Sequence, residues 1–153
     1  MKKIDISDLV IDILIPLGTG TIIGLLFQNY TSSIEEFNRT IVVPPILFPI
    51  VWSILYILIG IWYYFFGMEA STKQKILYYV LLGINLLFTP VLFYFKNIVL
   101  SLVITVVLLL GNIYLFIYSI RLDKKGYVLL PYLIWLLFAN VLMVDLLINN
   151  VLV

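Results

Sequence analysis

Aromatic side chains that end in a polar atom recur at helical spacing in two of the long apolar stretches. In residues 44–67, steps of three and four place one set on a single helical face: Pro49, Trp52, Tyr56, Ile59 and Tyr63. Such rings can stack on a flat apolar molecule while their polar atoms form hydrogen bonds. The pattern therefore indicates a binding surface. An aromatic belt at the headgroup level is the alternative, and it fits Trp52, Tyr56 and Trp135 less well than the tyrosines near the stretch ends.

Amide and carboxylate side chains also lie deep within the apolar stretches. Asn85 shares a helical face with Tyr78, Leu81, Phe88 and Leu92. Asp145 lies on the flank of a face made by Tyr132, Trp135, Ala139, Leu142 and Asn149. Because no basic residue in any stretch can pair with Asp145, we expect it to be neutral, near the membrane interface or facing a cavity. For Asn85 and Asn112, the alternative is hydrogen bonding between helices.

Several chemistries are excluded by residues that the chain lacks. It contains no cysteine, which excludes disulfides, thiolate catalysis and cysteine–metal sites. It contains no histidine, the commonest metal ligand and the usual general base. We therefore expect no metal site, no required cofactor and no strong axial ligation of haem iron. A net charge of +1 argues against a nucleic-acid partner.

The composition predicts an all-α membrane protein. Of the 153 residues, 64% are hydrophobic and 11% charged, and a globule of this size cannot bury so much apolar surface. Five stretches are long enough to cross a bilayer, which predicts a bundle of five transmembrane helices in a single domain over residues 1–153. The predicted spans are about 9–27, 44–67, 76–95, 98–120 and 127–150.

The polar segments predict how the bundle is oriented and covered. One end carries seven basic residues, which are Lys2, Lys3, Lys73, Lys75, Arg121, Lys124 and Lys125, and the other end carries Arg39 and Lys96. This bias predicts a cytoplasmic N-terminus, with the first loop and the C-terminus outside. Residues 28–43 form a loop long enough to act as a lid, and a plain solvated loop is the alternative. Gly20 and Gly24 form a G-x-x-x-G pair, which suits either a homodimer contact or packing within the chain.

Three segments resemble signature segments of the TspO/MBR family. They are FPIVWSILYILIG (48–60), INLLFTPVLF (84–93) and LPYLIWLLFANVL (130–142). Their order and spacing and the five-span plan match those of the family from about Pro44 to the end of the chain. These are the tryptophan-rich sensory proteins, whose relatives include the mitochondrial translocator protein, or peripheral benzodiazepine receptor.

The resemblance implies a five-helix bundle, often dimeric, whose pocket opens toward the first loop and binds porphyrins or other tetrapyrroles. It also implies a bacterial cell membrane. The positions that match family motifs near the pocket are Trp52, Tyr56, Asn85, Trp135 and Ala139, and Pro44 matches the loop-to-helix proline. The chain departs from the family pattern in four ways: a first loop without tryptophan, Phe88 in place of a tryptophan, Met143 in place of an asparagine, and the unusual Asp145.

The residues and the resemblance together predict a porphyrin receptor or scavenger. A flat macrocycle is expected between the second and fifth spans, stacked on Trp52 and Trp135, with its polar edge bound by Tyr56, Asn85 and Asn140. The full predicted ligand-binding set is Pro44, Trp52, Tyr56, Asn85, Phe88, Tyr132, Trp135, Ala139, Asn140, Leu142 and Asp145. Membrane lipid is the other expected partner.

Three alternatives remain open. Some bacterial members of the family break down protoporphyrin in light, and Trp52 and Trp135 are the only catalytic candidates for such an activity here. A transporter of porphyrin or another small hydrophobic ligand is the second, although no inverted repeat or charged pathway is visible. A structural assembly subunit is the third.

Overall fold

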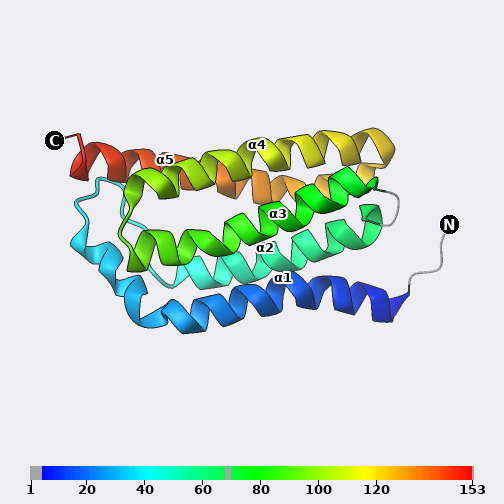
Figure 1. Cartoon of the computed structure of the whole chain (residues 1–153), viewed down its shortest axis with the longest axis horizontal. Helices are drawn as coiled ribbons and strands as arrows, with labels where there is room; N and C mark the ends of the chain where they lie inside the picture. Colours follow the sequence, from blue (N-terminus) through cyan, green and yellow to red (C-terminus); the bar gives the residue numbers. More distant parts are fainter. Residues whose placement is uncertain (1–4, 68–69, 153) are drawn as a thin grey trace.

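A computed structural model describes residues 5–67 and 70–152, and in these ranges the chain forms helices and no strands. Five long helices lie side by side (Figure 1). They are α1 (Ile6–Phe27), α2 (Leu47–Phe66), α3 (Thr72–Thr89), α4 (Ile98–Leu122) and α5 (Leu130–Asn150). Three short helical segments connect them: η1 (Gln28–Glu36), η2 (Pro90–Tyr94) and η3 (Lys124–Leu129).

The five helices confirm the predicted fold class. Each described span is long enough and apolar enough to cross a membrane, and even the 20 residues of α2 extend about 30 Å, which matches a bilayer core. Large apolar side chains such as Leu14, Leu26 and Leu110 are more than half exposed on the outside of the bundle. Those faces are suited to lipid rather than to water.

The chain runs up and down, so consecutive connections alternate between the two ends of the bundle. Figure 1 places the first loop and the C-terminus at one end and the start of α1 at the other. The end of α2, the start of α3 and the α4–α5 connection lie at the end where α1 starts. The basic residues therefore divide between the two ends as the sequence predicts, although Lys2 and Lys3 lie outside the described residues.

Small residues let α1 approach the rest of the bundle closely. A Cβ atom on Gly60 of α2 would lie 2.5 Å from both the Asp12 carbonyl oxygen and the Ile13 Cα, so only glycine fits at this crossing. Likewise a Cβ atom on Gly20 would meet the Tyr56 ring at 2.1 Å. Gly20 is therefore used for packing within the chain, whereas a Cβ atom on Gly24 would have no heavy atom within 4 Å. A homodimer stays a prediction.

The helix α3 ends in a wider turn at Pro90. A proline inside a helix lacks the N–H group that would continue the hydrogen-bond ladder. Here the Phe95 N–H instead donates to the Pro90 carbonyl at 3.0 Å, five residues back, and the backbone widens into η2. Leu92 and Phe93 both lie buried at the end of the bundle where the first loop packs.

Candidate ligand-binding cavity

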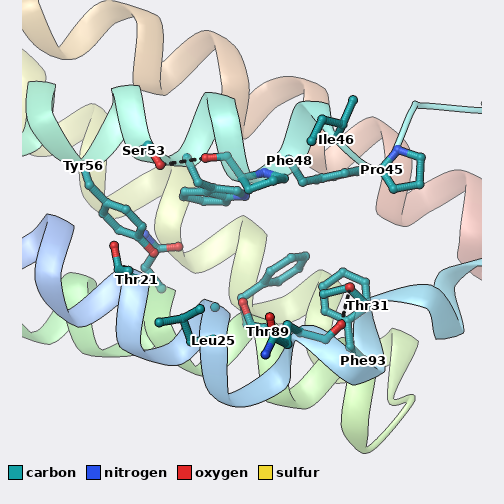
Figure 2. A pocket seen from close by; sticks show the side chains of 17 residues that line it. Thr21, Leu25, Thr31, Pro45, Ile46, Phe48, Ser53, Tyr56, Thr89 and Phe93 are labelled. Atoms are coloured by element: carbon teal, nitrogen blue, oxygen red, sulfur yellow. Dashed lines mark hydrogen bonds between the residues drawn. The ribbon is translucent and has the colours of Figure 1, made fainter.

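A cavity of about 550 Å³ lies between α1, α2 and α3, beneath the first loop. Figure 2 shows Tyr56 and Thr21 at one end of it, and Pro45, Thr31 and Phe93 at the other. Its lining residues are Gly20, Thr21, Gly24, Leu25, Gln28, Thr31, Pro45, Ile46, Phe48, Pro49, Trp52, Ser53, Tyr56, Asn85, Phe88, Thr89 and Phe93.

Aromatic rings supply much of the cavity wall. On α2, the Trp52 and Tyr56 rings lie 5.6 Å apart between centroids and are tilted by only 32°. They lie one helical turn apart, which is why the sequence pattern found both. Phe88 of α3 and Phe93 of η2 also line the cavity. A space lined by rings in this way is suited to a flat, apolar molecule.

Asn85 carries buried polar atoms in the cavity lining that have no hydrogen-bond partner within the described chain. Its side chain is 3% exposed, and neither its amide nitrogen nor its amide oxygen is bonded within the chain. Leaving a buried donor or acceptor unsatisfied costs about 1–3 kcal/mol, so such groups are rare unless something else binds them. The amide can offer one donor and one acceptor edge to a bound molecule.

The remaining polar groups of the cavity are neutral. Among the described residues that line it there is no Asp, Glu, Lys or Arg. Ser53 Oγ donates to the Pro49 carbonyl at 2.8 Å, and Thr31 Oγ1 donates to the Gln28 carbonyl at 2.8 Å. These hydroxyls keep an oxygen lone pair available for a ligand. An ionised group on a ligand would find no counter-ion inside the cavity.

No residue of α5 lines this cavity, so it differs from the pocket predicted between the second and fifth helices, which stays a prediction. The Trp52 and Trp135 rings meet edge to face, with centroids 6.5 Å apart and planes at 86°. Phe48 packs on Trp135 and Tyr132 packs on Trp52, with centroids 6.1 and 6.3 Å apart. These rings pack against one another between α2 and α5. The cavity lies against α1 and α3 instead, and Trp135 supports the ring of Trp52.

Four residues of the predicted ligand-binding set line the cavity: Trp52, Tyr56, Asn85 and Phe88. The other seven do not line it: Pro44, Tyr132, Trp135, Ala139, Asn140, Leu142 and Asp145. Pro44 immediately precedes Pro45, which does. Tyr132 and Ala139 are buried in the packing of α5. Contact of any of these residues with a ligand stays a prediction.

Asn140 joins two helices rather than facing the cavity. Its Oδ1 accepts from Thr105 Oγ1 at 3.0 Å, and its Nδ2 donates to the Thr105 carbonyl at 3.2 Å and the Leu136 carbonyl at 2.8 Å. Each of its polar atoms therefore has a partner, and α4 is tied to α5. Hydrogen bonding between helices, the alternative given for Asn85 and Asn112, is thus made by Asn140. Asn112 Nδ2 donates to the Leu108 carbonyl of its own helix at 2.8 Å.

Asp145 does not line the cavity and is instead bonded to the first loop. Its Oδ2 accepts the backbone N–H groups of Thr40 at 2.9 Å and Ile41 at 3.1 Å, and its Oδ1 accepts from Asn149 Nδ2 at 3.0 Å. The carboxylate lies near the end of α5 against the first loop, a position that fits the interfacial environment among the three expected for it. Hydrogen-bond donors compensate this carboxylate in place of a basic side chain.

The α1 wall was missed at the sequence level. Gly20, Thr21, Gly24 and Leu25 line the cavity, yet α1 carries no aromatic residue that would mark it as a binding helix before its last position, Phe27. The glycine pair was the available signal, since small residues leave room beside a neighbouring ring. The rim residues Gln28, Thr31, Pro45 and Ile46 belong to the first loop or directly follow it, but were not singled out.

Comparison with known proteins decides the family. The profile of the TspO/MBR family matches residues 13–148, from the first turns of α1 almost to the end of α5. This chain belongs to the TspO/MBR family. It is also similar to the tryptophan-rich protein TspO of Archaeoglobus fulgidus, with 34% identity over 102 residues that cover 65% of this chain and 67% of the relative. The predicted resemblance is thus confirmed, and the match includes most of α1. The chain is a multi-pass membrane protein of this family.

Proposed function

We propose that this TspO/MBR protein is a membrane receptor or scavenger that binds a porphyrin or another flat tetrapyrrole in the cavity between α1, α2 and α3. The observation that carries the proposal is the joint presence of the Trp52–Tyr56 ring wall and the unpartnered amide of Asn85 in one cavity. Membership of the TspO/MBR family supports the same class of ligand.

The size and polarity of the cavity favour one flat, largely apolar molecule. Its volume of about 550 Å³ lies within the range of about 300–1,000 Å³ that is usual for small-molecule sites. Because its lining residues are uncharged, the apolar ring of a tetrapyrrole is expected inside it. The carboxylates of the ligand are expected at the rim under the first loop, where water can solvate them.

Titration with protoporphyrin tests the proposal. The protein is held in lipid nanodiscs, and binding is followed by tryptophan quenching in wild type, Trp52→Phe and Trp62→Phe. Trp52 lines the cavity, whereas Trp62 is 1% exposed and stacks on Tyr78, away from the cavity lining, so Trp62→Phe is a matched control. We expect Trp52→Phe to weaken binding about twofold to threefold, since phenylalanine keeps a smaller ring on the wall and loses only part of the about 0.5–1.5 kcal/mol that an aromatic pair contributes. Equal affinity in all three proteins would contradict the proposed wall.

A second candidate function is light-dependent breakdown of the bound porphyrin. The observation that favours it is the set of oxidisable rings in contact with Trp52, which includes Tyr56, Tyr132 and Trp135. Illuminating the complex under oxygen and following the porphyrin absorbance separates the two functions. With a receptor, the porphyrin absorbance falls at the same rate as without protein. With a degrading protein, it falls faster. Uptake of porphyrin into vesicles tests the transporter alternative.

We propose a bacterial cell membrane location with the start of α1 inside and the first loop outside. The basic residues in the described ranges support it, since Lys73, Lys75, Arg121, Lys124 and Lys125 lie at one end and Arg39 and Lys96 at the other. The chain has no native cysteine, so the single variants Thr40→Cys and Lys124→Cys can be labelled from outside intact cells. We expect labelling at position 40 only. Labelling at position 124 instead would reverse the orientation.

A further inference from the structure

The end of α5 is bonded to the first loop through side chains that do not line the cavity. Besides the bonds of Asp145, Asn150 pairs with the backbone of Asn38 in both directions. The Asn38 N–H donates to Asn150 Oδ1 at 2.9 Å, and Asn150 Nδ2 donates to the Asn38 carbonyl at 2.7 Å. Asn149 Nδ2 reaches Thr40 Oγ1 at 3.3 Å. We name this set, which joins Asp145, Asn149 and Asn150 to residues 38–41, the α5 latch.

The latched segment lies between the two parts of the chain that line the rim of the cavity. Gln28 and Thr31 precede it, and Pro45 and Ile46 follow it. Pro45 comes only about four residues after Ile41, and an extended chain of that length spans at most about 14 Å. Fixing Ile41 therefore limits how far Pro45 and Ile46 can move away from the rim of the cavity.

Apolar residues before and after the latched segment are packed independently of the latch. Phe37 packs on the buried cluster that includes Leu92 and Met143, and Val43 is itself buried. The Glu36 carboxylate pairs with Lys96. Release of the latch therefore frees the chain after Phe37 and leaves the buried Val43 as the remaining attachment before the rim residues Pro45 and Ile46, while the bundle below stays packed. A short segment released between two anchors is the kind of local opening that proteins undergo without global unfolding.

We propose that the α5 latch sets the rate at which a ligand enters and leaves the cavity. Asp145 is its main positioning residue, because one carboxylate receives two backbone N–H groups and one amide N–H, and hydrogen bonds to an ionised group are the stronger kind. The inference rests on the proposed function only in its choice of a porphyrin as the probe. Opening of the latch itself is independent of which ligand binds.

Asp145→Ala tests the latch, with Asp123→Ala as the matched control. Asp123 Oδ1 also accepts a backbone N–H group, that of Lys125 at 2.8 Å, but at the opposite end of the bundle.

In Asp145→Ala we expect faster hydrogen exchange at the amides of Thr40 and Ile41. We also expect protoporphyrin association and dissociation to accelerate together by about tenfold, the effect of about 1.4 kcal/mol on a barrier, with Kd changed far less. A merely structural role for Asp145 would lower Tm and leave the two rate constants unchanged. Asp123→Ala is expected to match wild type.

Two further experiments test the latch, one by thiol access and one by cross-linking. Because the chain has no cysteine, Ser53→Cys places a single thiol in the cavity, and its reaction with a polar thiol reagent reports access without any ligand. Adding Asp145→Ala should raise that rate. In a separate protein, Thr40→Cys with Asn149→Cys, joined by a short reducible cross-linker, should slow porphyrin exchange until it is reduced. This arm does not depend on the folding of Asp145→Ala.

The inference is overturned if the cross-linked protein exchanges porphyrin at the wild-type rate. It is equally overturned if Asp145→Ala leaves both the thiol reaction of Ser53→Cys and porphyrin exchange unchanged while the Thr40 and Ile41 amides lose protection. If the wild type binds no porphyrin but the reaction rate of the thiol in Ser53→Cys still depends on Asp145, the proposed function fails and the latch stands.

Discussion

At the scale of single residues, two asparagines in the bundle have opposite hydrogen-bonding states. Asn140 has partners for both amide atoms and ties α4 to α5, whereas the buried amide of Asn85 has none. An unsatisfied buried amide is a cost to the fold, and a group retained at such a cost is expected where a ligand binds. Under the proposed function, Asn140 stabilises the bundle and Asn85 recognises the ligand.

Leucine substitutions should affect the two asparagines in opposite directions. Asn85→Leu removes two unsatisfied polar atoms and should raise Tm by about 2–4 °C, which corresponds to about 1 kcal/mol for a chain of this size. The same change should weaken protoporphyrin binding. Asn140→Leu breaks the bonds to Thr105 and should lower Tm while leaving binding largely intact. Thermal unfolding in detergent with and without porphyrin measures both effects, and a fall in Tm for Asn85→Leu would mean that its amide is satisfied within the fold.

The absence of histidine and cysteine leads to a second prediction, which concerns the affinity for porphyrin with and without iron. The chain has neither histidine nor cysteine, the most usual strong axial ligands of haem iron, which leaves tyrosine and methionine as the side chains that could ligate it. Metal-free protoporphyrin should therefore bind at least as tightly as its iron complex. Parallel titrations by tryptophan quenching compare the two, and a clear preference for the iron complex would show that ligation contributes to binding.

At the scale of elements, the close approach of α1 and α2 depends on Gly60. A methyl group there meets backbone atoms of Asp12 and Ile13, which cannot rotate away as a side chain can. Gly60→Ala should push α1 off the bundle and lower Tm. Gly83→Ala in α3 is the control, because a Cβ atom there has no heavy atom within 4 Å. Thermal unfolding of both variants checks this, and equal Tm values would mean that α1 packs more loosely than the crossing indicates.

The helices were predictable from the sequence, but their neighbours were not. Length and apolar composition predicted five spans, and the structure confirms them with bounds that differ by a few residues, as at Thr72 rather than Ile76 for the start of α3. Helical spacing correctly placed Trp52 and Tyr56 on one face. It could not tell which helix covers that face, because lipid and neighbouring helices are equally apolar. The partner of Asp145 was also beyond the sequence, since its bonds reach Thr40 and Ile41, which are far away along the chain.

At the scale of the whole molecule, the two halves of the bundle have different tasks. On one side α1, α2 and α3 surround a cavity, and on the other α4 and α5 pack through Asn140 and support Trp52 from behind through Trp135. The first loop joins the halves, because it lines the cavity and is also bonded to the end of α5. The proposed latch would thereby link ligand exchange to the attachment of the first loop.

Filling the cavity is the most direct test of its role. Gly24 lines the cavity with open space beside it, so Gly24→Leu should occupy that space without disturbing the helix. Gly83→Leu adds the same side chain on an exposed face of α3 and serves as the control. Protoporphyrin titration of both variants in the same nanodiscs should show at least a tenfold loss of affinity for Gly24→Leu, equivalent to about 1.4 kcal/mol, and wild-type affinity for Gly83→Leu. Wild-type affinity in Gly24→Leu would contradict binding between α1, α2 and α3.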